Sequence, residues 1–339
     1  MKVSVIFGGN GFVGTLFARY LLDLQLADKV YLYDNEKVIE KCNKFREELV
    51  ACDSRLVFVE GNVQYPIRFE PSESISLIAN FAAVHREPGH NSYEYYQTNL
   101  LGAENVCNFA ERVGCNRVIF TSSISPYGPS EKEKDESSLP VPVTAYGGSK
   151  LVAEKIHKTW QAKDLENRRL VIVRPGVVFG PGEGGNVSRL IRAVLRRYFF
   201  YMGNRSTRKA GVYVKELCHA MQWVLESQEK HGERVSLFNM TMNPGPSIQE
   251  YVDTICEVAN VKRIVPSVPY RLLLAVAYGL EVIARPFGVQ HPFSPVRIRK
   301  LVRSNNILPN YLVEKGYPYQ YTLKSAFEDW KKECPEEWK

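Results

Sequence analysis

The stretch VIFGGNGFVGTLFARYLL at residues 5–22 constrains the fold of this chain most strongly. An apolar, β-branched run is followed by Gly8, Gly11 and Gly14, and then by an amphipathic pattern of helical period. Such glycines permit a tight turn, close backbone approach to a pyrophosphate and close packing of helix on strand. The helix N-terminus also favours negative charge. The pattern predicts a dinucleotide-binding β-α-β unit.

The end of the next apolar run, KVYLYD, indicates which dinucleotide binds. Asp34 follows the last glycine by about 20 residues, where a carboxylate accepts hydrogen bonds from an adenosine ribose. A carboxylate repels a ribose 2′-phosphate, and no arginine adjoins Asp34 in the sequence. We therefore expect NAD rather than NADP. The net charge of +7 agrees with anionic partners, of which phosphate is the first candidate, and we expect no nucleic-acid partner.

Short apolar runs alternate with amphipathic stretches through the first half of the 339-residue chain. This order predicts an α/β fold, a Rossmann-type doubly wound parallel sheet covered by helices on both faces. After residue 181 the pattern becomes irregular and rich in proline, which indicates a smaller C-terminal substrate lobe. The expected strands are 2–8, 29–34, 55–61, 76–84, 117–123 and 169–175.

The expected division of the chain follows from this change of pattern. We expect residues 1–180 to form the NAD-binding domain, with residues 211–240 returning to it as a helix and a strand. Residues 181–339, mainly 181–210 and 241–339, are expected to bind the substrate. The charged run EKEKDESS at 131–138 is typical of a solvated loop.

Cysteine and histidine usage argues against disulfide and metal chemistry. The seven cysteines are odd in number and lack C-x-x-C spacing, and the six histidines show no metal-ligand spacing. The start of the chain also lacks the features of a signal peptide. We expect a reduced, cytoplasmic protein without a metal.

A tyrosine and a lysine four residues apart, in TAYGGSK, are the strongest catalytic candidates. Side chains at this spacing share one face of a helix, so Lys150 can approach both Tyr146 and a bound ribose. A free phenol, with a pKa of about 10, is a poor base at neutral pH, but a nearby ammonium favours the phenolate. The pair therefore predicts a tuned proton acceptor for a sugar or alcohol hydroxyl.

Six motifs in one order resemble the extended short-chain dehydrogenase/reductase family over nearly the whole chain. They are GGNGFVG, NFAAVH, TNLLGAENV, TSSISPYG, YGGSK and RPGVVFGPG. The resemblance implies that Ser123 polarises the substrate oxygen, that Tyr146 is the acid and base, and that Lys150 also holds the nicotinamide ribose.

The resemblance also implies which residues bind the cofactor and the substrate. Where the family usually has an aspartate that reaches adenine, this chain has Asn62. The expected NAD-binding residues are Gly8, Gly11, Phe12, Val13, Asp34, Asn62, Val63, Phe81, Ala82, Ala83, Asn99, Tyr146, Lys150, Pro175 and Val177. The expected substrate-binding residues are His85, Arg86, Ser125, Asn186, Arg208, Lys209 and Arg297, of which Arg208 and Lys209 compete for one basic position.

The two residues after Ser123 bear on the reaction. Dehydratases of this family carry an Asp-Glu pair there, whereas this chain has Ile124 and Ser125. Without that carboxylate pair, elimination of water is disfavoured, and reversible hydride transfer remains as the expected reaction. We expect an NAD-dependent epimerase that inverts C4 through a transient 4-keto sugar. A ketosugar reductase, a hydroxysteroid-type dehydrogenase and a non-catalytic NAD sensor are the alternatives.

Several stretches look most like a branch of bacterial surface-polysaccharide enzymes. Substrates of that branch include N-acetylhexosamine carried on a polyprenyl diphosphate and UDP-sugars, so we expect a sugar diphosphate here. The apolar segment at 268–289 is interrupted by charges and is too short to cross a bilayer. It predicts either a buried or dimer-forming helix or an interfacial helix beside a membrane. By resemblance we expect a homodimer, paired through the helices that begin near Asn91 and Tyr146.

Overall fold

The structure, a computed structural model, describes residues 1–35, 44–51, 53–86, 89–284 and 304–339. Its centre is a seven-stranded sheet in the order β11-β7-β5-β4-β1-β2-β3, in which each neighbouring pair is parallel. The strands are β1 (Val3–Phe7), β2 (Lys29–Asp34), β3 (Leu56–Glu60), β4 (Ile75–Asn80), β5 (Arg117–Thr121), β7 (Arg169–Pro175) and β11 (Val235–Met240). The α/β prediction with a doubly wound parallel sheet is confirmed.

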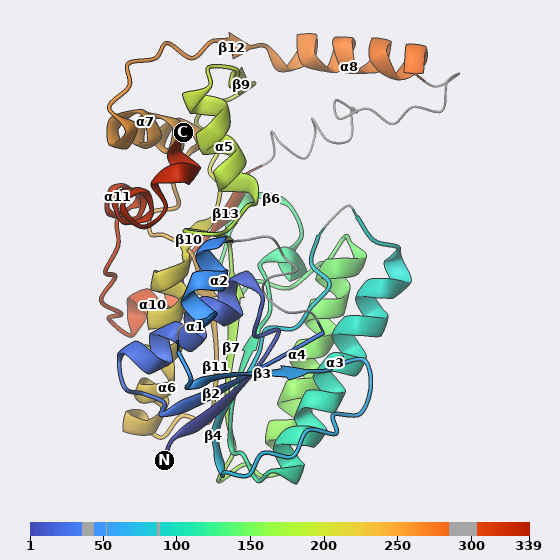
Figure 1. Ribbon diagram of the computed structural model, residues 1–339. Coiled ribbons are helices and arrows are strands. Elements are labelled where there is room, and N and C mark those ends of the chain that lie inside the picture. Colours follow the sequence, from blue (N-terminus) through green and yellow to red (C-terminus); the bar gives the residue numbers. More distant parts are fainter. Residues whose placement is uncertain (36–43, 52, 87–88, 285–303) are drawn as a thin grey trace.

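Helices cover both faces of this sheet, as Figure 1 shows. Side chains alternate along each strand, so Val171 and Val173 of β7 pack on one face and Leu170 and Ile172 on the other. The first face packs against α1 (Phe12–Asp23) and α6 (Val214–His231), and the second against α3 (Ser92–Arg112) and α4 (Ala145–Ala162). Burial on both faces explains why the strands are continuous apolar runs.

A third cluster of buried residues lies beyond the carboxyl ends of the strands. It centres on Phe179, Phe327 and Trp330. Its helices are α5 (Asn186–Leu195), α7 (Ile248–Ala259), α11 (Leu323–Glu333) and the short helix η4 (Pro335–Trp338). The short helix α10 (Asn310–Glu314) packs instead on the first face of the large sheet, through Leu312. The short strands are β8 (Val177–Phe179), which pairs with β10 (Gly211–Tyr213), and β9 (Tyr201–Met202), which pairs with β12 (Ser267–Val268).

The expectation of a loop at 131–138 is wrong for its first part. β6 (Ser130–Lys134) pairs in parallel with β13 (Asn305–Ile307). The charged composition predicts exposure correctly for Lys132 and Glu133, but it does not show that a distant segment supplies the backbone hydrogen bonds. The pairing joins the segment that follows β5 to the C-terminal region by backbone hydrogen bonds.

For the described part of this segment, residues 268–284, the alternative of a helix buried within this chain is also wrong. The helix α8 (Tyr270–Ala284) extends away from the rest of the protein in Figure 1. Its side chains Leu272, Val276 and Leu280 are 55%, 53% and 40% exposed. Among the described residues, no helix combines the length and apolar character needed to cross a membrane.

Candidate active site

The glycine-rich loop between β1 and α1 leaves no room for side chains. Gly8 has φ +73°, and a Cβ there would lie 2.8 Å from the backbone nitrogen of Ala82. A Cβ on Gly14, in the first turn of α1, would lie 2.3 Å from the carbonyl oxygen of Gly8. The loop therefore brings bare backbone and the helix N-terminus to the carboxyl edge of the sheet, an arrangement suited to a pyrophosphate.

Asp34 is buried at the end of β2, beside this loop. Its Oδ2 accepts a hydrogen bond from the backbone N–H of Asn10 at 3.0 Å. The guanidinium of Arg46, from α2 (Lys44–Ala51), donates to the carbonyl oxygen of the same Asn10 at 3.1 Å. Burial lowers the pKa of Arg46, while the charges of Asp34 and Glu337 oppose that shift. No arginine adjoins Asp34 in the sequence, but the fold brings Arg46 close to it.

Lys150 is buried beneath the end of β5. Its Nζ donates to the carbonyl oxygen of Thr121 at 2.7 Å and lies 4.8 Å from the centre of the Phe120 ring. Burial lowers the pKa of Lys150 to about 7, and the charge of Glu154 opposes this shift. The ammonium is therefore close to losing its proton at neutral pH.

The first turn of α4 packs on the turn that follows Ser123. The hydroxyl of Ser123 accepts from the backbone N–H of Ser125 at 3.1 Å. A Cβ on Gly147 would lie 2.7 Å from the carbonyl oxygen of Ser125, so the backbone next to Tyr146 touches this turn. Lys150 of α4 binds Thr121, which ends β5 two residues before Ser123. The fold therefore brings Ser123, Tyr146 and Lys150 together.

Asn99 of α3 joins α4 to the segment after β4. Its Oδ1 accepts from the N–H of Val84 at 2.9 Å, and its Nδ2 donates to Oγ of Ser149 at 2.9 Å. Oγ of Ser149 in turn donates to the carbonyl oxygen of Tyr146 at 2.9 Å. Asn99 therefore fixes the turn that carries Tyr146 relative to residues 81–84, which follow β4.

His85 and Arg86 stand at the end of that segment. Both side chains are exposed. Desolvation by the surrounding protein lowers the pKa of His85, and the charge of Lys150 adds to this effect. His85 is therefore close enough to Lys150 for their charges to interact.

The remaining predicted cofactor residues lie in the loops, strand ends and helix start at the carboxyl edge of the sheet. Asn62 follows β3, and its Oδ1 accepts from the N–H of Gln64 at 2.9 Å, which caps a local turn. Val63 is buried. The carbonyl oxygen of Pro175, at the end of β7, accepts from the N–H of Ile124 at 3.2 Å, and Val177 begins β8. Phe12 and Val13 begin α1, directly after Gly11.

The predicted substrate residues are distributed over the C-terminal region. Asn186 begins α5, is exposed, and accepts a hydrogen bond from Arg189 at 2.7 Å. Arg208 donates to the carbonyl oxygen of Gly245, and Lys209 is the next residue of the same extended segment. Because successive side chains of an extended chain point to opposite sides, Lys209 faces away from Gly245. Arg297 lies outside the described residues.

The chain matches the description "NAD dependent epimerase/dehydratase family" over residues 4–238. The chain belongs to this family. The match includes the glycine-rich loop, Asp34, Ser123, Tyr146 and Lys150, which are the parts of the site that the sequence predicted.

Individual relatives extend over nearly the whole chain. A polyprenyl-linked sugar enzyme of Escherichia coli O157:H7, N-acetyl-alpha-D-glucosaminyl-diphospho-ditrans,octacis-undecaprenol 4-epimerase, is 25% identical over 96% of this chain and 92% of its own length. A 3beta-hydroxysteroid-dehydrogenase/decarboxylase of Arabidopsis thaliana is 24% identical over 88% of this chain and 71% of its own length. The fold is similar to that of UDP-glucuronic acid 4-epimerase from Bacillus cereus in complex with NAD, with a TM-score of 0.74, 15% identity and full coverage of both chains.

The cofactor of this family member is NAD, and the residues present fit it. A Cβ at Gly8 or Gly14 would meet the backbone of Ala82 or of Gly8, so these glycines let the loop and the N-terminus of α1 pack closely, as a pyrophosphate site of this type requires. Asp34 offers a carboxylate for the adenosine ribose at the neighbouring strand end. The described residues contain no cluster of His, Cys, Asp or Glu suited to a metal ion.

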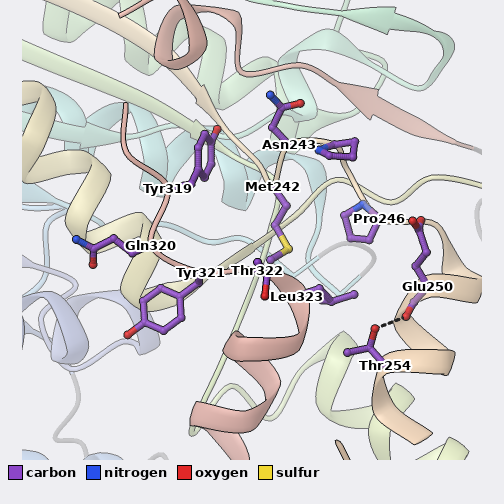
Figure 2. A pocket seen from close by; sticks show the side chains of 11 residues that line it. Met242, Asn243, Pro246, Glu250, Thr254, Tyr319, Gln320, Tyr321, Thr322 and Leu323 are labelled. Carbon is purple, nitrogen blue, oxygen red and sulfur yellow. Dashed lines mark hydrogen bonds between the residues drawn. The ribbon is translucent and has the colours of Figure 1, made fainter. Parts of the chain in front are cut away.

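A pocket shown in Figure 2 lies apart from these residues. It is formed by the chain after β11 and the chain before α11, and its lining includes Met242, Pro244, Tyr319 and Tyr321. None of the predicted catalytic, cofactor or substrate residues lines it. We therefore assign the chemistry to the carboxyl edge of the sheet and not to this pocket.

Sequence reasoning missed a buried ion pair below the site. Arg174, at the end of β7, donates through Nε and one terminal nitrogen to the two carboxylate oxygens of Glu154, at 2.8 and 2.7 Å. The sequence could have indicated that Glu154 lies near Lys150, because it follows Lys150 by four residues and so shares its face of α4. The sequence carries no comparable signal for its pairing with Arg174.

Proposed function

We propose that this protein is an NAD-dependent sugar 4-epimerase that acts through a transient 4-keto sugar. The observation that carries the proposal is the combination of Ser123, Tyr146 and Lys150 with Ile124 and Ser125 at the positions where dehydratases have a carboxylate pair. Such a site can move a hydride and a proton reversibly, but it lacks the acid and base needed to eliminate water. The substrate is a UDP-sugar or a polyprenyl-diphosphate-linked N-acetylhexosamine of surface-polysaccharide biosynthesis.

In this mechanism Tyr146 accepts the proton of the C4 hydroxyl as C4 loses its hydride, and it returns the proton when the hydride is restored to the opposite face. Bound NAD supplies the acceptor and the donor of that hydride. Lys150 favours the phenolate form of Tyr146 through its positive charge. Ser123 donates a hydrogen bond to the substrate oxygen. Its single O–H proton is donated to Oγ of Ser125 at 3.1 Å in this structure, so the hydroxyl turns from Ser125 to the substrate when the sugar binds.

The likeness to the Arabidopsis dehydrogenase favours a second function, net oxidation or reduction of a ketosugar or a hydroxysteroid-type alcohol. The two functions differ in their use of cofactor. An epimerase recycles bound NAD, whereas a dehydrogenase or reductase makes or consumes NADH in proportion to product.

We propose that residues 1–180 and 211–240 hold NAD and that 181–210 and 241–339 hold the sugar diphosphate. Asn186 and Lys209 are our candidates for the diphosphate, with Arg297 as a further cation. Arg208, whose guanidinium donates to the carbonyl oxygen of Gly245, is the alternative to Lys209 for the same basic position. His85, Arg86 and Ser125 are our candidates for the sugar, because His85 interacts with the charge of Lys150, Arg86 adjoins His85, and Ser125 contacts the turn that carries Tyr146.

Product stereochemistry together with NADH absorbance tests the function. The purified protein is denatured to release and identify bound nucleotide, and native protein is then incubated with UDP-sugars and, separately, with polyprenyl-diphosphate sugars. We expect retained NAD, a sugar inverted at C4, and no net NADH. A net change in NADH with a new carbonyl or alcohol would establish the dehydrogenase function instead.

We propose that two copies pair through α3 and α4. The two helices pack side by side, and they expose Tyr93, Tyr96 and Leu101 of α3 and Val152 of α4. Light scattering should give twice the mass of one chain, and Leu101→Glu should shift the protein toward the monomer because a charge would enter the apolar contact. A monomeric unmodified protein would contradict the pairing.

We propose that α8 contacts the surface of an anionic membrane. Its exposed residues Leu272, Val276 and Leu280 follow one another at four-residue intervals and so form one stripe. Arg271 on the same helix is exposed, and α5 and the residues that follow it expose Arg189, Arg192, Arg196 and Arg197. Apolar side chains beside cations are typical of a surface that inserts between anionic headgroups.

Flotation with vesicles tests this contact. We expect the protein to float with vesicles that contain anionic lipid, less so at high salt, and the Leu272→Glu/Val276→Glu variant to stay in solution. Leu139→Glu/Val141→Glu is the control, because it also places two negative charges on one leucine and one valine, which are 78% and 54% exposed in the loop before α4. Equal flotation of both variants would contradict the role of α8.

A further inference from the structure

The buried pair of Glu154 and Arg174 joins α4, the helix that carries Tyr146 and Lys150, to β7. Both side chains are almost completely shielded from solvent, at 2% and 4% exposed. Arg174 also lies over the ring of Tyr127, with 4.7 Å between the guanidinium carbon and the ring centre. Burying two charges is costly even when they pair, so their presence is weak support for a purely stabilising role.

The carboxylate of Glu154 reaches the same end of β5 as the ammonium of Lys150. Oγ of Ser122 donates to Oε1 of Glu154 at 2.5 Å, while Nζ of Lys150 donates to the carbonyl oxygen of Thr121 at 2.7 Å. Thr121 and Ser122 are consecutive, and Ser123 follows them. The two charged groups are therefore neighbours on two successive turns of α4, and they bind two successive residues at the end of β5.

The charges around Lys150 come from three elements. On α4, Glu154 raises the pKa of Lys150 against the lowering caused by burial. The charge of Lys150 in turn contributes to lowering the pKa of His157 on α4 and of His85 after β4, both of which burial lowers first. Arg174 on β7 contributes a second cation, which holds the carboxylate that Lys150 needs.

We propose that Glu154 and Arg174 are positioning residues that set the charge of Lys150. The carboxylate of Glu154 favours the ammonium form of Lys150. The guanidinium of Arg174 limits that effect, because it binds the same carboxylate. This role rests on the proposed function at one point, the assumption that Lys150 supports Tyr146 during catalysis. The pair acts through Lys150 and touches neither sugar nor cofactor.

Direct titration of Lys150 tests this proposal without any substrate. The NAD-bound protein is labelled with ¹³C at the lysine Cε, and the signal of Lys150 is identified by its loss in Lys150→Met. In Glu154→Gln we expect the midpoint of this signal to fall by about one pH unit, because an opposite charge within a few ångströms favours the ammonium by that order. In Arg174→Met we expect it to rise, because a like charge is removed and the carboxylate is released toward Lys150.

A double variant and a surface control complete the experiment. Glu154→Gln/Arg174→Met removes both charges, leaves neither one unpaired, and should give a midpoint between those of the single variants. If Glu154→Gln does not fold, this double variant and Arg174→Met together still test the proposal. Glu111→Gln, which breaks an exposed pair with Lys163, should leave the midpoint of Lys150 unchanged.

The direction of the shifts decides the outcome. Opposite shifts in the two single variants support the proposal, whereas unchanged midpoints in the variants that fold would assign the pair a structural role and overturn it. Because Lys150 must keep its proton, the loss of epimerase activity at high pH should move to lower pH in Glu154→Gln and to higher pH in Arg174→Met. Opposite NMR shifts without C4 inversion of any sugar would refute the proposed function and leave this inference standing.

Discussion

Tyr146→Phe should abolish sugar interconversion while NAD still binds. The change removes one oxygen from the first turn of α4, where the backbone of Gly147 packs on Ser125 and Asn99 fixes the turn through Ser149. Because the ring remains, the fold and the cofactor site should persist. Loss of a positioned acid and base typically costs about 10²- to 10⁴-fold in rate. The measurement is the initial rate of C4 inversion, together with NAD affinity.

Tyr96→Phe is the matched control for this variant. Tyr96 is exposed on α3, and its hydroxyl approaches the backbone of Gly148, on the same first turn of α4. Because the Tyr96 hydroxyl has no part in the proposed proton transfer, its removal should leave the rate within about twofold, and surface substitutions of this kind usually change stability little. If Tyr146→Phe kept the rate of the unmodified protein, Tyr146 would not be the proton acceptor and the mechanism would be wrong.

The features that the sequence predicted depend on short spacings. The glycine-rich loop and the pair of Tyr146 and Lys150 can each be identified within a window of a few residues, and Asp34 by its place at a strand end about 20 residues after the last glycine. The periods of strands and helices produce these patterns without any knowledge of distant contacts. For the same reason the strand boundaries of the sheet agree closely with those expected, although β4 ends at Asn80 and the chain then continues as a loop held by Asn99.

The features that the sequence did not predict depend on long-range contacts. Three contacts join segments that only the fold brings close together. They are the pairing of Glu154 with Arg174, the approach of Arg46 to Asn10, and the pairing of β6 with β13. The apolar stripe of α8 is a different case. Its period predicts a helix, but the period does not determine whether protein or another surface covers the stripe.

Gly14→Ala should weaken NAD binding strongly, because the added carbon has no space. It would lie 2.3 Å from the carbonyl oxygen of Gly8 and 2.9 Å from the Cα of Gly9, both of which are backbone atoms that cannot rotate away. The loop or the helix must shift, and overpacking of this kind costs about 1–3 kcal/mol. If that cost falls on the bound state, NAD affinity should fall about 10- to 100-fold, since about 1.4 kcal/mol is a factor of ten.

A matched substitution separates the packing effect from a general effect of replacing glycine in a helix. A Cβ on Gly279 of α8 would meet no heavy atom of the described residues within 4 Å, so Gly279→Ala should leave NAD affinity unchanged. Titration of nucleotide-free protein with NAD, with thermal melting of both variants, measures the two effects. Undiminished NAD affinity in Gly14→Ala would mean that α1 can move away from the loop at no cost. The close approach of helix to loop would then not be what holds the pyrophosphate, and the helix N-terminus alone would have to account for its binding.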